Sequence, residues 1–548
     1  MAAEVPGVAI TWPDLDAPAG EGWARRDGAG PAAESLQVWL RACARSGWAA
    51  PLGTESAGIA LASGRVTAGA VRALWSVPAH RAAAMDGIAV SAADTRAATP
   101  ERPTRLPPGE FDVIDTGDLM PDGRDAVIMR EHLRHLGDGS VEISNAVAPG
   151  RHVRSPGEDI RAGTLLLPAG HRVRPVDVAA LAGAGHRTIA VRRRPVVAIL
   201  PTGDEVRPVG SVPAPGEVLD TNSLMLAGMA GEAGGEVLAL PIVPDQPDVI
   251  ATAVARVARR ADVVLVIAGS SAGRGDHTAA VVRRLGHIAV QGVAIRPGHP
   301  VLLGVLSGDR PVPVVGVPGY PGSAERAFTC FVLPLLNVLL GITRSEQRYS
   351  VPARLACPVS SAPHLEEYLR LRLARVLDPR TGREDLVAVP LRRGAGALNT
   401  IIQTEALLRI PIGISGVAAG AEVAPIPLGG AAFETATTII AGPRSPAADA
   451  LLEESGARGV VQWIESSARE ASEALATGLC HVAALGADDA LAGGPGDFLA
   501  ALAERIGKLA TLRISAREAL VLPALAWDSS PVMVLRGALL ATREAPES

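Results

Sequence analysis

A chain of 548 residues is longer than a single hydrophobic core normally organises, so its length predicts roughly three to five domains. Hydrophobic residues make up 48% and charged residues 20%, which is typical of a soluble globular protein, and a formal charge of -5 argues against a general nucleic-acid binder. No apolar run of about eighteen residues predicts a membrane span, and the N-terminus does not read as a signal peptide. We therefore expect a cytoplasmic protein without a membrane or nucleic-acid partner.

The four cysteines, Cys43, Cys330, Cys357 and Cys480, lie far apart and form no CxxC pair. Their spacing predicts buried thiols in a reducing compartment, not a zinc site or a disulfide framework. The basic residues are almost all arginine, and Lys508 is the single lysine. An arginine where another protein uses lysine therefore says little about a change of chemistry.

The N-terminal part of the chain predicts a series of small regions. Residues 1–30, rich in Ala, Gly and Pro, predict a flexible N-terminus. Residues 31–80 predict a helical linker region, whose second helix begins at Thr67. Residues 81–160 read as short strands separated by Gly, Pro and Asp turns, which is typical of a β-rich domain, and a helix is predicted over 174–185.

From residue 193 the hydrophobic pattern changes. Short apolar runs alternate with helices predicted over 222–233 and 247–260. This alternation predicts a three-layer α/β domain over 193–343, with a parallel-rich sheet covered on both faces. Strands return over 344–430 and predict a compact β domain, and residues 431–548 predict a further α/β segment.

Four loops follow the apolar strands of the predicted sheet, where parallel α/β sheets bind their ligands. These loops are residues 202–205, 244–245, 270–276 and 318–323. The small residues of 269–275 let backbone N–H groups approach an anion such as phosphate, and the helix that follows adds a favourable dipole. The carboxylates of Glu205, Asp245 and Asp276 would repel phosphate directly, so their presence beside it suggests a bridging Mg²⁺ ion.

A purely structural interpretation of these loops stays open. Gly, Pro and Asp turns are what any α/β domain needs at strand ends, and Asp there often caps the next helix. Taken singly, each loop fits that interpretation better; four loops on one sheet edge favour a phosphate–metal site. The chain has no P-loop, GxGxxG or Ser/His/Asp arrangement, and His277 and His299 read as isolated histidines.

Eight motifs in order resemble one known family. They are "AMDGIAV", "DTGDLMPDGRDAVIMRE", "PGEDIRAG", "PTGDEV", "LDTN", "GSSAGRGDHT", "VAIRPGHPVLLG" and "GVPGYPGSAERAF". The family is that of the molybdopterin molybdenumtransferases, which insert molybdate into adenylylated molybdopterin and whose eukaryotic counterpart is the C-terminal domain of gephyrin. The resemblance covers roughly residues 35–430, and the order of the motifs is far more specific than any one of them.

The resemblance implies a multidomain α/β plus β fold. It implies a linker region split between 31–80 and 161–192, a β-rich domain, a nucleotide-binding-like α/β domain over 193–343 that binds molybdopterin, and a small β-barrel domain over 344–430. An extra C-terminal α/β segment over 431–548 resembles, more faintly, part of a periplasmic-binding-protein-like domain. The family also implies a homodimer whose active site lies between subunits.

The activity implied by the resemblance is Mg²⁺-dependent. Hydrolysis of the adenylyl phosphoanhydride releases AMP, and the dithiolene of molybdopterin takes up molybdate as a substrate. The resemblance leaves tungstate open in place of molybdate. Protein partners that fit this role are molybdopterin adenylyltransferase and molybdoenzyme chaperones.

The motif matches carry site residues onto this chain. Catalytic roles fall to Asp86, Asp159, Glu205, Asp245 and Asp276, of which Glu205, Asp245 and Asp276 are the expected metal ligands. Substrate-binding roles fall to Thr116, Gly269, Ser271, Gly273, Arg296, His299, Pro318, Gly319, Pro321 and Ser323.

Several positions depart from the family pattern. Arg296 and His299 stand where lysines are usual, Tyr320 where an Asn is common, and Ala395 where a Ser is usual. Arg296 keeps the charge with a different geometry, whereas an imidazole is only partly charged near neutral pH. These departures favour an alternative: a catalytically weakened carrier or sensor of the cofactor that uses the C-terminal segment.

Overall fold

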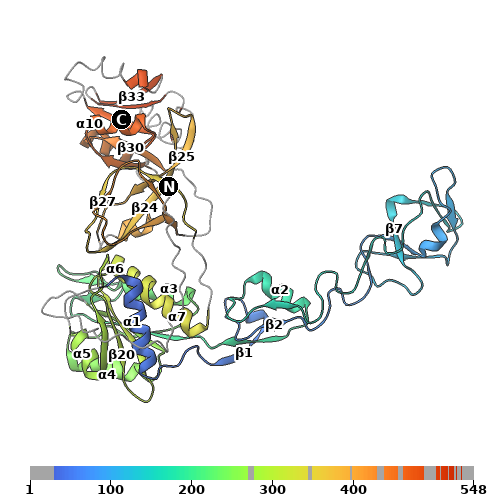
Figure 1. Ribbon diagram of the computed structural model, residues 1–548, viewed down its shortest axis with the longest axis horizontal. Helices are drawn as coiled ribbons and strands as arrows, with labels where there is room; N and C mark the ends of the chain where they lie inside the picture. The colour runs from blue at the N-terminus through green and yellow to red at the C-terminus, as the bar shows by residue number, and fades with distance from the viewer. Residues whose placement is uncertain are drawn as a thin grey trace. The chain divides into compact units, whose positions relative to one another are not determined.

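The computed structural model describes residues 30–268, 277–342, 349–394, 398–428, 437–454, 461–486, 502–505, 508–515, 518–523, 526 and 532. The chain forms two compact units (Figure 1). The smaller unit comprises residues 49–195 and 336–344, and the larger unit comprises 1–48, 196–335 and 345–548. The N-terminus predicted to be flexible lies, apart from Gly30, outside the described residues.

A six-stranded sheet lies at the centre of the α/β part of the larger unit. Its strands, in spatial order, are β16 (Glu236–Ala239), β13 (Val196–Pro201), β17 (Val263–Ala268), β21 (Val312–Pro318), β20 (Leu302–Leu306) and β18 (Gly286–Gln291). The first four run parallel, β20 is antiparallel to β21, and β18 is antiparallel to β20. The predicted parallel-rich sheet is confirmed, with an antiparallel edge that the sequence pattern did not indicate.

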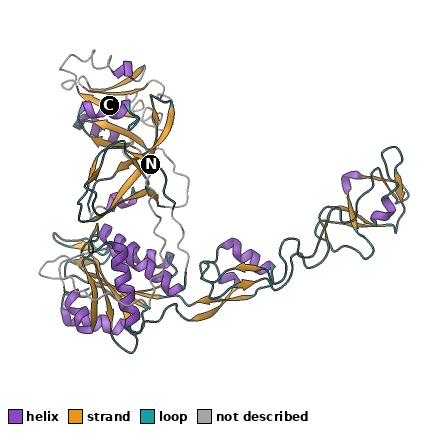
Figure 2. Cartoon of the chain, in the orientation of Figure 1, coloured by secondary structure: helices purple, strands orange, loops and turns teal. Residues whose placement is uncertain are grey.

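Helices cover both faces of this sheet (Figure 2). They are α1 (Ala32–Arg45), α3 (Thr221–Glu232), α4 (Pro247–Ala258), α5 (Thr278–Leu285), α6 (Pro321–Ala327) and α7 (Leu333–Leu340), with a π-helical turn at Phe328–Val332 between the last two. The predicted helices over 222–233 and 247–260 correspond to α3 and α4. Along β13, Leu200 belongs to the core under α4, whereas its neighbour Ile199 is fully buried on the opposite face.

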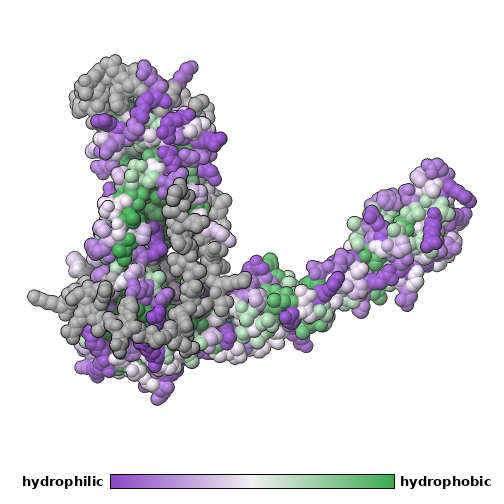
Figure 3. Space-filling model, viewed as in Figure 1, coloured by the Kyte–Doolittle hydropathy of each residue, from purple (hydrophilic) through white to green (hydrophobic). Residues whose placement is uncertain are grey.

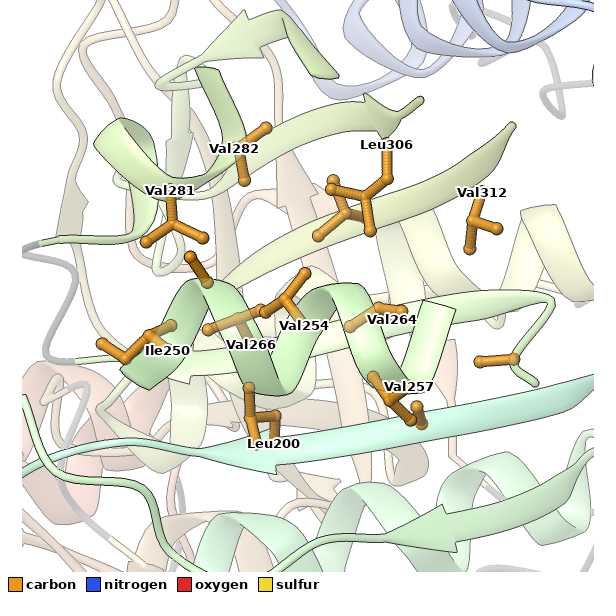
Figure 4. Close-up of a cluster of buried hydrophobic side chains, with 14 of the residues drawn as sticks. Leu200, Ile250, Val254, Val257, Val264, Val266, Val281, Val282, Leu306 and Val312 are labelled. Atoms are coloured by element: carbon orange, nitrogen blue, oxygen red, sulfur yellow. The ribbon is translucent and has the colours of Figure 1, made fainter. Parts of the chain in front are cut away.

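Helix α4 shows why this core forms. Ile250, Val254 and Val257 recur at helical spacing and are buried, so the helix presents one apolar face. Figure 4 shows these side chains against Val264 and Val266 of β17. Pro247 occupies the first turn, where its missing N–H costs no hydrogen bond.

One described helical stretch, Pro321–Leu340, is long and apolar enough to cross a membrane by composition alone. It contains Glu325 and Arg326, and 61% of its most apolar window is buried among the protein's own side chains. A core helix has the same properties, so this stretch is weak grounds for a membrane span.

The smaller unit is built mainly from short antiparallel strands. One sheet has the order β6 (Phe111–Ile114), β4 (Gly87–Val90) and β7 (Ala126–Met129), and a second has the order β5 (Thr104–Leu106), β9 (Val141–Ile143) and β8 (Leu133–His135). The predicted helix over 174–185 forms as α2 (Pro175–Gly183). Large hydrophobic side chains such as Leu74 and Trp75 stay exposed, and Figure 3 shows hydrophobic residues among hydrophilic ones on the visible face of this unit.

The second helix predicted from Thr67 is wrong. Val71–Arg72 form strand β2, which pairs with β11 (Leu165–Leu167). The Thr67 side chain is no helix cap, because its Oγ1 donates a hydrogen bond to the carbonyl oxygen of Pro168 at 2.6 Å. Pairing with a segment about 95 residues away in sequence therefore overrides the local helical pattern.

A second sheet, of seven strands, belongs to the larger unit. Its path is β28 (Glu422–Val423), β22 (Ala353–Leu355), β25 (Arg383–Pro390), β24 (Glu366–Asp378), β26 (Ala406–Ile410) and β29 (Ile426–Pro427), and β19 (Ile295–Arg296) pairs with β24. β19 comes from the α/β part of the chain and runs parallel to β24. The two sheets are thus joined through backbone pairing.

The C-terminal segment forms a third sheet, in the order β31 (Val461–Glu465), β30 (Thr438–Gly442), β32 (Val482–Gly486), β34 (Glu518–Pro523) and β33 (Leu509–Ser515). With α9 (Pro446–Glu454) and α10 (Ala468–Ala476) it has the predicted α/β character. One hydrophobic core joins it to the β24–β25 hairpin, with Val376 and Val389 on one side and Ile439 and Leu475 on the other.

A buried histidine adds a polar link between the same parts. His481 Nδ1 accepts a hydrogen bond from the Ile439 N–H at 2.9 Å, so the proton lies on Nε2, which donates to the Arg375 carbonyl oxygen at 2.8 Å. Burial lowers the pKa of His481 to about 4. The imidazole is therefore neutral, with both ring nitrogens hydrogen-bonded.

This packing makes Gly478 irreplaceable. Its φ is +65°, and a Cβ atom there would lie 2.7 Å from the Asp378 Cα atom. We expect Gly478→Ala to destabilise the larger unit by about 2–4 kcal/mol, since backbone strain adds to the clash. Gly382→Ala is the matched control, with φ +67° and no atom within 4 Å of the new methyl group. Equal midpoints of urea unfolding for the two variants would contradict the tight junction.

Candidate functional site

A cavity of about 1190 Å³ lies in the larger unit. On one side it meets the ends of the parallel strands, where Thr202 follows β13, Ile267 is the last residue but one of β17, and Pro318 ends β21. On the other side it meets β24 and residues 391–394, from the seven-stranded sheet and the loop after β25. The ligand position expected for a parallel α/β sheet is therefore a real cavity.

Carboxylates line the side formed by the six-stranded sheet. Glu205, Glu217 and Asp220 are the acidic residues there. Asp220 caps α3 by accepting a hydrogen bond from the Ser223 N–H at 3.0 Å, and Glu217 pairs with Arg207. Among the described residues the Glu205 carboxylate has no such partner, which leaves it available to a ligand.

Asp245 lies close to this acidic side. Its backbone N–H donates to Asp204 Oδ1 at 3.2 Å. Burial raises the pKa of Asp245, and the negative charges of Glu205 and Asp204 raise it further. Thr202 and His277 oppose this rise in the pKa without cancelling it. Three carboxylates therefore share one region, and a cation would relieve their mutual repulsion.

The described residues do not complete a metal site by themselves. They contain no group of three or more His, Cys, Asp or Glu side chains arranged to hold a metal ion. The third expected ligand, Asp276, lies outside the described residues, as do Gly269, Ser271, Gly273 and Ala395. Glu205 and Asp245 are close enough for their charges to interact, as the resemblance implied for two members of the metal set.

Basic side chains line the opposite side of the cavity. They are Arg296, His299, Arg370, Arg392 and Arg393, with Glu367 among them. Arg296 is the cross-strand neighbour of Glu367, and its Nη1 lies 3.6 Å from Glu367 Oε1. Arg393 Nη1 lies 3.5 Å from the same oxygen. This side carries more positive than negative charge and suits an anion.

His299 presents one ring nitrogen to ligands. Its Nδ1 lies 2.7 Å from the Val293 carbonyl oxygen, which only an N–H can satisfy, so Nδ1 carries a proton and donates it. In the neutral ring Nε2 is then a hydrogen-bond acceptor and has no proton to donate to an anion. His299 can bind an oxyanion through Nε2 only in its protonated form.

Behind the basic side lies a buried ionic cluster. Arg370 Nη2 and Arg326 Nη2 lie 3.7 Å and 3.3 Å from Glu325 Oε2. The Arg326 guanidinium stacks over the Tyr368 ring, 4.4 Å from its centre. Burial lowers the pKa of Arg370, although Glu325 opposes that shift.

The turn before α6 brings the predicted Pro318, Gly319, Pro321 and Ser323 to the cavity. Asn222 holds this turn, because its Nδ2–H donates to the Gly319 carbonyl oxygen at 2.7 Å.

Several of the lining residues were not predicted from the sequence. They are Asp220, Asn222, Glu367, Arg370, Arg392 and Arg393. Asp220 and Asn222 belong to the family motif "LDTN", but which side of β24 faces the cavity depends on how the two sheets pack.

Three predicted residues belong to the smaller unit. Asp86 Oδ1 accepts hydrogen bonds from the Thr116 hydroxyl and backbone N–H, both at 2.7 Å. These bonds hold the pKa of Asp86 below its usual range. The structure thus brings Asp86 and Thr116 together, while Asp159 lies in the loop at 155–159, with its N–H donating to the Val77 carbonyl oxygen.

Three family models match the chain. The MoeA N-terminal region (domain I and II) matches residues 31–185, a probable molybdopterin binding domain matches 198–338, and the MoeA C-terminal region (domain IV) matches 352–428. The matched regions take in residues of both units and both sides of the cavity and end before the C-terminal sheet.

Individual relatives agree with these matches. A molybdopterin molybdenumtransferase of Nostoc sp. is 30% identical over 388 residues, which cover 68% of this chain and 88% of the relative. Molybdopterin molybdenumtransferase 2 of Mycobacterium tuberculosis is 30% identical over 393 residues, which cover 66% and 92%. A molybdopterin biosynthesis MoeA protein from Pyrococcus horikoshii superposes with a TM-score of 0.61 at 30% identity, covering 73% of this chain and all of that one.

The crowded carboxylates predict a gain of stability in Asp245→Asn. Folding raises the pKa of the Asp245 carboxyl group. The wild-type protein is therefore not destabilised by this group at a pH below the pKa that Asp245 has in the unfolded chain, and it loses stability as the pH rises and the carboxyl group ionises. We therefore expect a higher Tm for the variant at pH 7 without divalent ions, and no difference near pH 3. The exposed Asp309→Asn is the control. A lower Tm for Asp245→Asn at pH 7 would contradict the repulsion.

Proposed function

Since the chain belongs to the molybdopterin molybdenumtransferase family of transferases, we propose that the cavity of the larger unit binds adenylylated molybdopterin and molybdate. The proposed reaction cleaves the phosphoanhydride with water, releases AMP and inserts molybdate into the dithiolene. The two thiol groups bind molybdenum through their sulfur atoms, and their two protons leave with one molybdate oxygen as water. Molybdenum cofactor biosynthesis is thus the role we assign to this protein.

The separation of charge across the cavity carries this proposal. One sheet contributes Glu205, with Asp245 nearby, and the other contributes Arg296 and Arg370. A phosphoanhydride needs a metal cation, which the carboxylates can hold, and an oxyanion needs cations, which the guanidinium groups supply. Few ligand pairs other than a metal-bound nucleotide and a free oxyanion would use both sides.

Mg²⁺ fits the acidic side. Carboxylate oxygens are its preferred protein ligands, and a bound cation would oppose the rise in the pKa of Asp245 that burial and the neighbouring Glu205 and Asp204 carboxylates cause. Glu205 and Asp245 would hold the ion, with Asp276 as the third ligand on the strength of the family resemblance. When bound, Mg²⁺ supplies charge that stabilises the departing phosphate oxygens.

The chain's own residues do the rest of the proposed work. Arg296 and Arg393 hold molybdate, and His299 assists when protonated. The Pro318–Pro321 turn, fixed by Asn222, shapes the wall against which the pterin nucleotide lies. A cavity of about 1190 Å³ is large enough to hold such a ligand beside an oxyanion.

The proposal includes a cytoplasmic homodimer and the domain division predicted from the sequence. In such a dimer Asp86, Thr116 and Asp159 would serve a site shared between subunits. The family resemblance supports this, and the lowered pKa of Asp86 keeps that carboxylate ionised at physiological pH.

Purified protein should release AMP from adenylylated molybdopterin when both Mg²⁺ and molybdate are present. We expect Glu205→Gln to lower kcat at least about 100-fold, the scale of losing one preorganised electrostatic contact, and Asp276→Ala to do the same. The exposed Glu236→Gln is the control for charge. Turnover of Glu205→Gln at the wild-type rate would contradict the metal assignment. Tight binding of the nucleotide by wild-type protein without AMP release would favour the carrier or sensor alternative.

His299→Lys should lower the KM for molybdate about tenfold, because a lysine ammonium donates hydrogen bonds to an oxyanion, whereas Nε2 of the neutral imidazole only accepts them. Steady-state AMP release at varied molybdate concentration measures this. An equal KM for the variant and the wild type would show that the His299 ring takes no part in binding the oxyanion.

A further inference from the structure

Glu367 is a buried carboxylate on the basic side of the cavity. Its side chain is 5% exposed, although the residue lines the cavity. Oε1 faces Arg296 Nη1 at 3.6 Å and Arg393 Nη1 at 3.5 Å. Oε2 is buried and accepts no hydrogen bond from the described residues. The two guanidinium groups are therefore its counter-charges.

Two other charged groups near Glu367, those of Glu366 and Arg370, already have partners of their own. Glu366, its neighbour on β24, accepts hydrogen bonds from Arg409 of β26 and from the Tyr368 hydroxyl. Arg370 of β24 pairs with Glu325 of α6. His299, after β19, lines the same cavity.

Together with Arg392, the two counter-charges are the exposed arginines that an anion in the cavity can reach. The side chains of Arg296 and Arg393 are 55% and 36% exposed, whereas that of Arg370 is 9% exposed. An oxyanion on the basic side would draw on the guanidinium groups that now compensate Glu367. A carboxylate that loses its partners while buried is strongly destabilised in its charged form.

We propose that Glu367 is a built-in counter-anion of the oxyanion subsite: an entering tetrahedral dianion takes over Arg296 and Arg393, and Glu367 takes up one proton from solvent. The inference rests on the proposed function, because it assumes that the basic side binds molybdate. It makes Glu367 a residue that sets the affinity for the oxyanion and couples binding to pH. Each coupled proton changes the affinity by up to about tenfold per pH unit, with tighter binding at lower pH.

Calorimetric titration of the full-length protein with sodium molybdate tests this. At one pH, two buffers of different ionisation enthalpy give the number of protons taken up per molybdate. We expect Glu367→Gln to take up about one proton fewer than the wild type and to bind molybdate about tenfold more tightly near neutral pH. Glu384→Gln, an exposed carboxylate on β25, should match the wild type.

A second variant keeps the test independent of how Glu367→Gln folds. His299→Gln removes the imidazole that lines the same cavity and introduces no ionisable group, so proton uptake that remains on molybdate binding does not come from position 299. We expect about one proton per molybdate in this variant near neutral pH. No proton uptake in His299→Gln would overturn the inference.

The remaining outcomes separate this inference from the proposed function. If Glu367→Gln binds molybdate with the affinity and proton uptake of the wild type, or more weakly, while the wild type still releases AMP, only the role of Glu367 is overturned. If the wild type neither binds molybdate nor releases AMP in its presence, the oxyanion subsite and the proposed function are both wrong.

Discussion

Two residues of backbone, Ile295 and Arg296, connect the two sheets on which the cavity depends. They run parallel to the start of β24, and the Glu366 N–H donates to the Ala294 carbonyl oxygen at 2.8 Å. The same junction includes the Glu366 carboxylate, which accepts a hydrogen bond from the Ala32 N–H at the start of α1. Without this pairing the strand ends and the arginine side chains would belong to separate surfaces and would not line one cavity.

Joining the sheets places charges where water is partly excluded, so each group needs a partner. Arginine side chains pair with the carboxylates of Glu366, Glu325 and Glu367. In a buried ion pair, removing one partner destabilises the fold by more than the intact pair stabilises it. On the acidic side Asp245, Glu205 and Asp204 repel one another, and among the described residues Thr202 and His277 offset this only in part. A ligand of the opposite charge can use the imbalance that remains.

Local patterns in the sequence predicted the candidate site residues that lie in loops directly after the parallel strands. The apolar runs and helical periods of 193–343 predicted the parallel sheet with α3 and α4, and Glu205 and Asp245 follow from the rule that ligands bind beyond parallel strands. Glu367 and Arg370 could not be found this way, because alternation along a strand does not say which face meets a distant sheet. For the same reason the helix predicted from Thr67 gave way to a strand paired far along the chain.

The C-terminal sheet lies beyond the matched family regions, yet it packs against the same strand that lines the cavity. A domain tethered by a linker would keep its own core, yet here one core includes Val376 of β24 and Leu475 of α10. His481 adds a buried hydrogen bond to the Arg375 carbonyl oxygen, which an independent domain would have to break. β24 therefore carries cavity residues at one end and the C-terminal sheet at the other. Any displacement of that sheet must strain the strand that holds Glu367 and Arg370, so the extension bears on the site through the backbone of β24.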